Sequence, residues 1–217
     1  MSIVHHVGDD LLVSYAAGAL AEGWSIAVAT HLAMCPECRK RADAAEAMGG
    51  AMLDDLGGQA VEQASWDAVR ARLTAAPAPT PAKPRPAATA HTIPQPLRDY
   101  LGGDLEDVRW RALGKGASQV RIKTGDRSTQ VRLLRIPAGK PVPEHTHGGR
   151  ELTLVLSGSF HDGETVFARG DIEDADASLT HQPTATPEAD CICLAVTDAP
   201  LRFSSWVVRL VQPILRI

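Results

Sequence analysis

The sequence has no long apolar run, few aromatic residues, only four cysteines and no excess of positive charge. No uninterrupted apolar stretch is long enough to cross a bilayer, and residues 1–10 have neither the basic nor the apolar part of a signal peptide. We therefore expect a cytoplasmic protein with no membrane partner. The net charge of −4 argues against direct nucleic-acid binding, because that binding draws on clustered Lys and Arg.

A proline-rich segment divides the chain. Residues 77–96 hold seven of the fifteen prolines and almost no large apolar side chains, so this segment is expected to be a semi-extended spacer. The whole chain is 44% hydrophobic and 22% charged, which is typical of a globular protein. Its 217 residues can supply two domains, and we expect these at 1–76 and 97–217 on either side of the 77–96 linker.

The two parts differ in their periodicity. Before the linker, apolar residues recur at helical spacing, as they do in the stretch Val61–Ala75, where Trp66, Val69 and Leu73 share one face. After the linker, short alternating runs separated by turn residues indicate strands of a β-sandwich or barrel. The expected fold class is multidomain α + β, with a small helical bundle followed by a β-barrel. The clearest strand candidates are Gln119–Ile122, Gln130–Ile136, Leu152–Leu156 and Cys191–Val196.

The helical part contains a set of residues with the spacing of metal ligands. His31, Cys35 and Cys38 stand at positions i, i+4 and i+7, which lie along one face of a helix. Pro36 suits the first turn of a helix and not its interior, so we expect one helix to end and another to begin between the two cysteines. A Cys in that first turn still points toward its partner.

A structural zinc ion needs four N or S ligands in a tetrahedron, so this set needs one more. His5 and His6 are the two candidates, and spacing alone does not separate them. The thin, Ala-rich core of the helical part makes a stabilising zinc ion reasonable, since such an ion supplies roughly 10–16 kcal/mol of apparent binding energy. The alternative is that both cysteines are ordinary small buried residues and His31 is a hydrogen-bonded helix histidine.

In these residues the sequence resembles the zinc-binding anti-sigma factors, whose N-terminal domain carries an upstream His followed by H-x3-C-x2-C. The matching residues here are His5 and His6, then HLAMCPEC from His31 to Cys38. The resemblance implies a helical bundle that binds an extracytoplasmic-function sigma factor and blocks its access to RNA polymerase. It also favours His6 as the fourth zinc ligand and implies that this zinc is structural.

The second part contains another set of candidate metal ligands. The stretch from Gly139 to Gly158 reads G-x5-H-x-H-x3-E-x6-G, in which His145, His147 and Glu151 keep the same parity and so face one side of a strand. Two imidazoles and a carboxylate suit Zn, Fe, Mn or Ni, and a distant His would complete the set. His181 is the best completing ligand, because it follows a turn-like segment and precedes the strand at 191–196. The alternative for the first three is a polar loop edge.

This stretch matches the first cupin motif in every position, so residues 97–217 look like a cupin β-barrel. Of the second cupin motif only Gly170 and His181 are present. Together the two parts resemble the ChrR-type anti-sigma factors, a likeness that extends to LEDVRWRALG, ELTLVLSGSF, DCICLA and TDAPLRF. That family implies an extracytoplasmic-function sigma factor as partner and singlet oxygen or related oxidants as the signal.

The function predicted on these grounds is an anti-sigma factor whose metal-binding cupin senses oxidative stress and triggers release of the sigma factor. We predict structural Zn²⁺ in the first part and a second divalent metal, with Zn²⁺ favoured, in the cupin. No residue is assigned a catalytic role. The alternative function is a dioxygenase-like cupin enzyme with a helical assembly domain, which would need a pocket lined by substrate-anchoring Arg or Gln, with Arg132 and Arg135 as candidates.

Cys191 and Cys193 form a separate pair, two positions apart in an apolar run. Both side chains should lie on one face of a strand, an arrangement that does not favour a direct disulfide. Two interpretations remain open: they are small buried hydrophobic residues, or their oxidation forms part of sensing.

Overall fold

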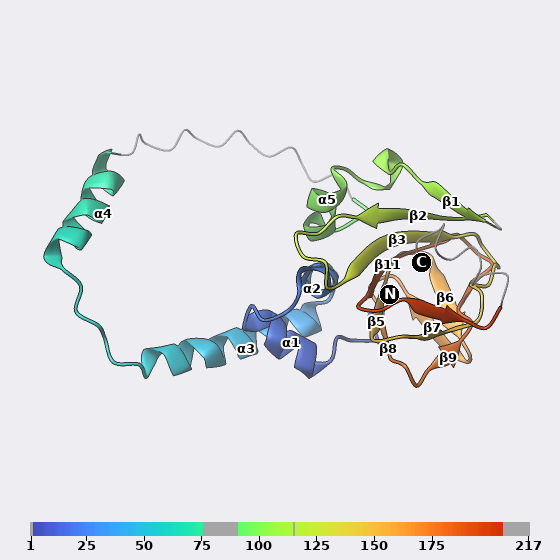
Figure 1. Ribbon diagram of the computed structural model, residues 1–217, viewed down its shortest axis with the longest axis horizontal. Coiled ribbons are helices and arrows are strands. Elements are labelled where there is room, and N and C mark those ends of the chain that lie inside the picture. Colours follow the sequence, from blue (N-terminus) through green and yellow to red (C-terminus); the bar gives the residue numbers. More distant parts are fainter. Residues whose placement is uncertain (1, 76–90, 115, 206–217) are drawn as a thin grey trace.

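The computed structural model describes residues 2–75, 91–114 and 116–205 of the chain, so most of the expected linker, 77–90, lies outside the described residues. Four helices precede the linker; a short helix begins at Gln95, within the last two residues of the expected linker, and a 3-10 turn follows it (Figure 1). Cys35 is the N-cap of the third helix and Pro36 is its first residue, which confirms the predicted break between the two cysteines. The helices are α1 (Asp9–Ala16), α2 (Glu22–Met34), α3 (Pro36–Asp54), α4 (Gln63–Ala75), α5 (Gln95–Leu101) and the 3-10 turn η1 (Leu105–Asp107).

The second part of the described chain is built from antiparallel strands, and the four predicted strands are all present within one residue or two of their expected ends. The strands are β1 (Arg111–Gly114), β2 (Ala117–Ile122), β3 (Gln130–Ile136), β4 (His145–His147), β5 (Glu151–Ser157), β6 (Ser159–Asp162), β7 (Thr165–Ala168), β8 (Ile172–Ala175), β9 (Thr180–His181), β10 (Thr184–Ala185), β11 (Cys191–Thr197) and β12 (Leu201–Phe203).

These strands have a cupin-like arrangement, but within the described residues they do not close into the expected barrel. They form a six-stranded sheet, β1-β2-β3-β11-β5-β8, and two three-stranded sheets, β10-β6-β7 and β12-β4-β9. Gly158, with a φ of +69°, ends β5 and sends the chain into β6 of a different sheet. Pro183 cannot donate a ladder hydrogen bond, and it separates β9 from β10. The ladder is therefore interrupted where a barrel would continue.

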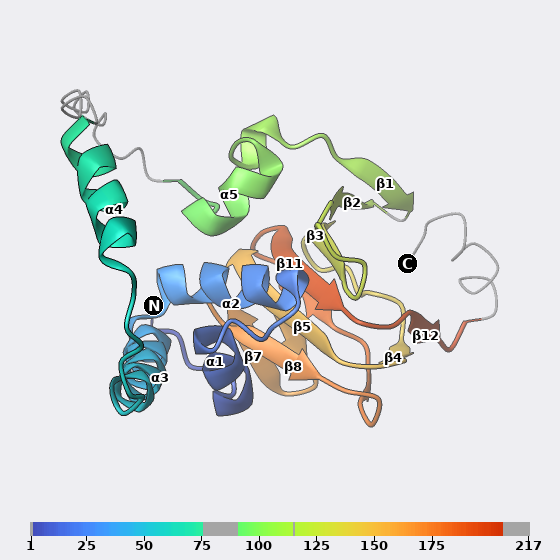
Figure 2. The ribbon, with the colours of Figure 1, turned by 60° about the vertical axis from the view of Figure 1, so that its left-hand side comes forward.

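Helices and sheet share one hydrophobic core. Leu12 of α1 and Val28 of α2 are fully buried in the same cluster as Leu154 and Leu194, which lie on the central strands β5 and β11. Leu97 of α5 joins this cluster from the other side of the linker, and α5 lies beside α2 (Figure 2). The side-chain periodicity of each part does not reveal this packing, because an apolar helix face looks the same whichever surface covers it.

Helix α4 is different from the other helices. It lies far from the sheet, at the end of an extended connection that follows α3, and none of its residues is buried (Figure 1). The sequence predicts this amphipathic helix correctly, but the helix does not pack its apolar face into the core as a bundle helix would.

Candidate metal centres and partner surface

Three local features bring the N-terminal ligand candidates together. His31 lies in the last turn of α2, Cys35 caps the start of α3, and Cys38 lies in the first turn of α3. The extended chain before α1 carries His6 to the same place. His31, Cys35 and Cys38 are all buried, so the cluster lies inside the packed helices and only His6 is exposed.

The distances between these ligand atoms fit a tetrahedral ion. Nδ1 of His6 lies 3.4 Å from Sγ of Cys35 and 3.4 Å from Sγ of Cys38, and the four ligand atoms all lie within 4.8 Å of one another. Ligands at about 2.0–2.3 Å from a tetrahedral zinc ion are themselves roughly 3.3–3.8 Å apart. Within the described residues, the buried Nε2 of His31 has no hydrogen-bond partner. A metal ion at this point could be coordinated by the lone pair of this Nε2 atom.

The electrostatics of this cluster also favour a cation. Burial lowers the pKa of His31 to about 4, so its imidazole is neutral at pH 7 and can act as a ligand. Burial raises the pKa of the Cys38 thiol, so the thiolate is disfavoured unless a positive charge is present. A zinc ion would supply that charge and displace the thiol protons.

The structure also separates His5 from His6. His6 faces the two cysteines, whereas the ring of His5 packs on Phe167, with centroids 4.4 Å apart, and its Nδ1 lies 3.6 Å from a carboxylate oxygen of Asp171. Both Phe167 and Asp171 belong to the cupin-like part. His5 therefore contacts the second part of the chain, while His6 completes the four-residue cluster.

Strands β4, β5 and β9 position the second set of ligand candidates. His145 and His147 are the two buried ends of β4, and Thr146, which points to the other side of the strand, is partly buried. His181 of β9 pairs directly with His145 across the ladder, and Glu151 is the first residue of β5. The structure thus gathers the three histidines, whose ligand atoms lie within 4.8 Å of one another, and places Glu151 beside His147.

Each of the three imidazoles uses its Nδ1 for a hydrogen bond away from the centre. The acceptors are the carbonyl of Pro143 for His145, at 2.8 Å, the carbonyl of Asp176 for His147, at 3.1 Å, and a carboxylate oxygen of Asp162 for His181, at 2.9 Å. With Nδ1 as donor, each Nε2 carries a free lone pair. The three histidines therefore present the form of imidazole that binds a metal.

The free Nε2 atoms converge. Those of His145 and His181 are 3.2 Å apart, and Nε2 of His147 lies 3.6 Å from Oε2 of Glu151. Nε2 of His147 and Oε2 of Glu151 are buried and, within the described residues, form no hydrogen bond. Three nitrogen atoms within 4.8 Å of one another, with a carboxylate oxygen next to one of them, are the kinds of donor that a divalent metal binds.

Burial disfavours the charged forms of two residues in this second cluster. It lowers the pKa of His145 to about 4 and raises the pKa of Glu151 to about 7. His181 is an exception, since burial lowers its pKa but the carboxylates of Glu173 and Asp162 outweigh burial and raise it. A divalent ion would stabilise the Glu151 carboxylate in this buried place.

Asp162 and Glu173 contact a candidate ligand, and the sequence pattern does not indicate either of them. Both direct carboxylate oxygens at Nδ1 of His181, from 2.9 Å and 3.7 Å. In the sequence, Asp162 looks like part of an Asp-Gly hairpin turn, and Glu173 stands in a turn-like acidic stretch. Only the pairing of distant strands reveals their contact with His181.

A small cavity of about 70 Å³ lies beside the second cluster. Its lining is mostly apolar and includes His145, His181, Cys191 and Cys193, so the two cysteines do share one face of β11. Interaction with Cys191 and burial raise the pKa of Cys193, and neither cysteine is in a disulfide. Of the described residues, no Arg or Gln lines this cavity. The substrate-anchoring residues that an enzyme would need are therefore not found here.

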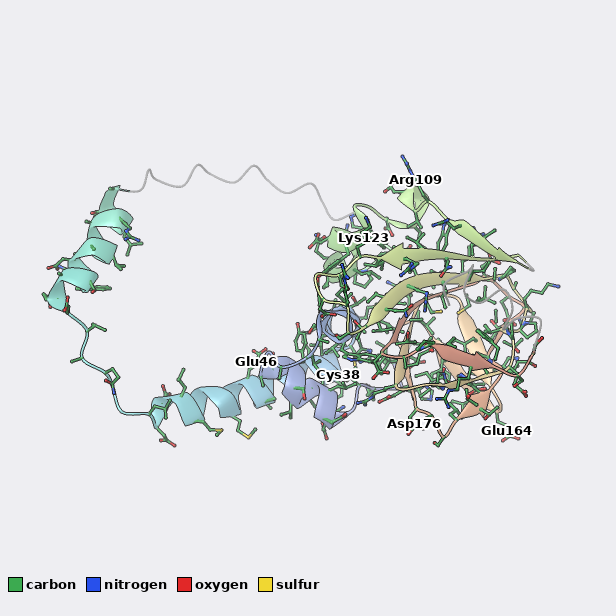
Figure 3. All side chains as sticks on the ribbon, viewed as in Figure 1. Cys38, Glu46, Arg109, Lys123, Glu164 and Asp176 are labelled. Atoms are coloured by element: carbon green, nitrogen blue, oxygen red, sulfur yellow. The ribbon has the colours of Figure 1, made fainter. Side chains whose placement is uncertain are left out.

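The C-terminal half of α3, the connection after it and α4 form an exposed apolar surface, which we call the apolar arm. Figure 3 shows its side chains projecting with no other part of the fold over them, whereas Cys38, at the start of α3, lies where the helix meets the rest of the molecule. Large apolar groups gathered on one exposed surface mark a binding site for another protein. The exposed apolar residues of the arm are Met48, Met52, Leu53, Leu56, Val61, Trp66, Val69 and Leu73.

None of the helices in the part of the chain that the structure describes combines the length and the apolar character that a bilayer crossing requires.

Comparison with known proteins gives consistent results over the whole chain. The family model of the ChrR cupin-like domain matches residues 100–200. The chain is 50% identical, over 218 aligned residues that cover 100% of both sequences, to the anti-sigma-E factor ChrR of Cereibacter sphaeroides.

Two solved structures illustrate the range of similarity. A crystal structure of Rhodobacter sphaeroides SigE in complex with the anti-sigma ChrR contains a chain that is 47% identical, with a TM-score of 0.80. The match covers 91% of this chain and 100% of that one. An RmlC-like cupin protein of Ralstonia eutropha is 25% identical over 48% of this chain and 71% of its own, with a TM-score of 0.41.

Proposed function

The chain belongs to the ChrR family of anti-sigma factors, and from this premise we propose that it binds an extracytoplasmic-function sigma factor and keeps it from RNA polymerase. It is a regulator rather than an enzyme. We place it in the cytoplasm, where the polymerase and its sigma factors work.

The observation that carries this proposal is the apolar arm. Eight large apolar side chains of the arm are exposed, and Trp66, Val69 and Leu73 of α4 lie on one face of a helix that packs against nothing else in the described chain. Such a helix gains little stability by itself, because most helical stability in proteins comes from packing an apolar face. A sigma factor that covers this face would bury the arm, and its own surface would then be unavailable to RNA polymerase.

We propose that Zn²⁺ is held by His6, His31, Cys35 and Cys38 and that it is structural. The ion would tie the N-terminal extended segment to the junction of α2 and α3, from which the apolar arm extends. The zinc-binding bundle is thus the base of the arm. In this scheme residues 1–76 form the sigma-binding part, 77–96 the linker and 97–217 the sensing part.

We further propose that His145, His147, Glu151 and His181 hold a second divalent metal, with Zn²⁺ favoured, and that this centre senses oxidative stress of the singlet-oxygen type. A signal can shift an equilibrium only if it binds or modifies one state differently from the other. The small cavity lies beside the ligands, and Cys191 and Cys193 line it, so an oxidant that enters it would meet both metal ligands and thiols. The shared core of helices and sheet gives such a change a route to the sigma-binding part.

The test is a binding experiment with the sigma factor encoded alongside this chain. Purified full-length chain should co-elute with that sigma factor and stop it from supporting transcription by the polymerase core enzyme. Treatment of the complex with a singlet-oxygen generator should release active sigma factor. Absence of a complex refutes the anti-sigma function, whereas a complex that ignores the oxidant refutes only the sensing role.

A further inference from the structure

The turn between β7 and β8 belongs to the cupin-like part, yet it holds the segment that carries His6. Oδ1 of Asp171 accepts hydrogen bonds from the backbone N–H groups of Val4, at 2.7 Å, and His5, at 2.9 Å. Its Oδ2 accepts from the N–H of Ala168 at 2.9 Å, so the carboxylate is fixed on both sides. The side chain of Asp171 is only 3% exposed. These bonds fix the backbone directly before His6.

The same turn also orients His31. Its Nδ1 donates to the carbonyl of Gly170 at 2.9 Å, which leaves Nε2 free and directed at the cysteines. Gly170 has a φ of +94°, and a Cβ at this position would lie 2.5 Å from Cδ1 of Ile3. A side chain here would therefore need a strained backbone and would displace the side chain of Ile3. Two of the four N-terminal ligands, His6 and His31, depend on Gly170 and Asp171 for their positions.

Strand β8 continues from this turn toward the other centre. Glu173, two residues after Asp171, is buried, and its Oε1 lies 3.7 Å from Nδ1 of His181. Its strand pairs with β5, where Glu151 is opposite Ala175 and Thr153 is opposite Glu173. The four residues 170–173 thus contact the N-terminal ligands at one end and a cupin ligand at the other. A backbone segment this short and this buried has little freedom to absorb a displacement at either end.

We propose that Asp171 is a positioning residue of the N-terminal metal centre, and that through residues 170–173 metal binding in the cupin strengthens metal binding at Cys35 and Cys38. This inference rests on the two metal centres of the proposed function. When the cupin metal is absent, His181 loses the partner of its Nε2 and is held only through its Nδ1, by Asp162 and Glu173. The turn that holds Val4, His5 and His31 then loses a constraint. Because coupling of this kind is reciprocal, N-terminal metal also strengthens cupin binding.

The experiment measures Co²⁺ affinity at the N-terminal centre of the full chain by competition with a chelator. Co²⁺ bound to thiolates gives an intense sulfur-to-metal charge-transfer band. Of the two centres only the N-terminal one has Cys ligands, and loss of the band in Cys38→Ser assigns it. His145→Ala removes one ligand of the cupin centre and leaves every residue of β8 in place; the Nδ1 of His145 bonds to the Pro143 carbonyl, and its Nε2 lies 3.2 Å from that of His181.

Asp126→Ala is the matched control. Asp126 is also a carboxylate of the cupin-like part that accepts a backbone N–H of the helical part, that of Glu22 at 2.6 Å, but it lies away from both metal centres. Asp171→Ala should lower the Co²⁺ affinity roughly tenfold, as loss of a ligand-orienting group commonly does. His145→Ala should lower it about fivefold or more. In a chain that already carries Asp171→Ala, adding His145→Ala should lower the Co²⁺ affinity by less than about a further twofold. Asp126→Ala should leave both the Co²⁺ affinity and the effect of His145→Ala on it as in the native chain.

Three results would overturn the proposal. If His145→Ala leaves the Co²⁺ affinity of the N-terminal centre unchanged, the coupling is refuted. If Asp126→Ala and Asp171→Ala lower that affinity equally, the cause is a general loosening of the contact between the helical and cupin-like parts and not the positioning of ligands by Asp171. If Asp171→Ala does not fold, Asp171→Asn is the substitute, because it keeps the shape of the side chain and one acceptor oxygen. It should still weaken Co²⁺ binding at the N-terminal centre, and an affinity equal to that of the native chain contradicts the role of Asp171. A native chain with no charge-transfer band refutes the N-terminal centre itself, and co-elution with the sigma factor is measured separately.

Discussion

Replacing Trp66 with Ala should weaken sigma-factor binding strongly and leave the free chain as stable as before. Trp66 is 48% exposed, and a tryptophan side chain offers roughly 200 Å² for burial, so about 100 Å² is available to a partner. At about 25 cal/mol per Å², covering this area contributes about 2.4 kcal/mol, which corresponds to roughly a 60-fold change in Kd. Because α4 has no buried residue, the unfolding free energy should stay within about 0.5 kcal/mol of the native value.

The assay is a titration of labelled sigma factor with the full chain, together with thermal unfolding of the chain alone. Asp67→Ala is the control, because Asp67 follows Trp66 by about 100° around the helix, away from Val69 and Leu73. It should bind within about threefold of the native chain, since an exposed polar contact contributes little. Ala is also a better helix former than Trp, so Trp66→Ala cannot act by melting α4. Native affinity in Trp66→Ala, or an equal loss in both variants, would refute α4 as the binding surface.

Four further predictions concern the metal centres and the turn at Gly170. Cys38→Ser, or removal of metal with a chelator, should lower the melting temperature and abolish sigma binding, as checked by metal analysis and co-elution, because the N-terminal segment loses its tie to α2 and α3. In the metal-free chain, the pKa values of His31 and His145, about 4 when folded against 6.5 when unfolded, mean that the unfolded state takes up protons first as pH falls. Stability should therefore be full above pH 6.5 and be lost toward pH 4, by about 2 kcal/mol per histidine at pH 5 in urea unfolding, and a flat profile would contradict this. Glu151→Gln should abolish cupin metal binding yet stabilise the metal-free chain at pH 8. The pKa of Glu151 is about 7 in the folded chain, so its ionisation opposes folding as pH rises through that value. A metal-free variant that is less stable than the metal-free native chain at pH 8 would contradict this reasoning. Gly170→Ala should cost about 1–3 kcal/mol in the same assay, whereas Gly163→Ala, which also has a positive φ but no atom within 4 Å of its new Cβ, should cost less.

The ligand clusters could be predicted from the sequence because their spacing is local. His145 and His147 are two apart on one strand, and His31, Cys35 and Cys38 follow a helix face and its break at Pro36. The same short-range rules located the helix at 63–75 and the main strands. The structure brings together His6, His31, Cys35 and Cys38 in one place and His145, His147 and His181 in another, with Glu151 beside His147, and metal binding by these residues stays a prediction.

What the sequence could not indicate depends on which surfaces meet. An amphipathic helix has the same periodicity whether its apolar face packs into a bundle or stays exposed for a partner protein. The sequence of α4 therefore does not indicate that this face is exposed. Asp162 and Glu173 contact His181 from 19 and 8 positions away, and Asp171 holds the backbone of Val4 from 167 positions away. Isolated carboxylates in turn-like stretches carry no local sign of such contacts. The prediction of a closed barrel was also wrong. Gly158 and Pro183 redirect the chain between strands, and the alternation of polar and apolar residues does not indicate where this happens.

The bond between Val4 and Asp171 has a consequence for synthesis of the chain. The two residues are 167 positions apart, and at about 5–20 residues per second the ribosome makes Asp171 roughly 8–33 s after Val4. During that interval α1, α2, α3 and α4 have emerged, but the turn that aligns His6 and His31 does not yet exist. A nascent chain, or one truncated before β8, therefore carries the apolar arm on an unfinished base. The hydrogen bonds that hold the backbone before His6 can therefore form only after synthesis has passed β8.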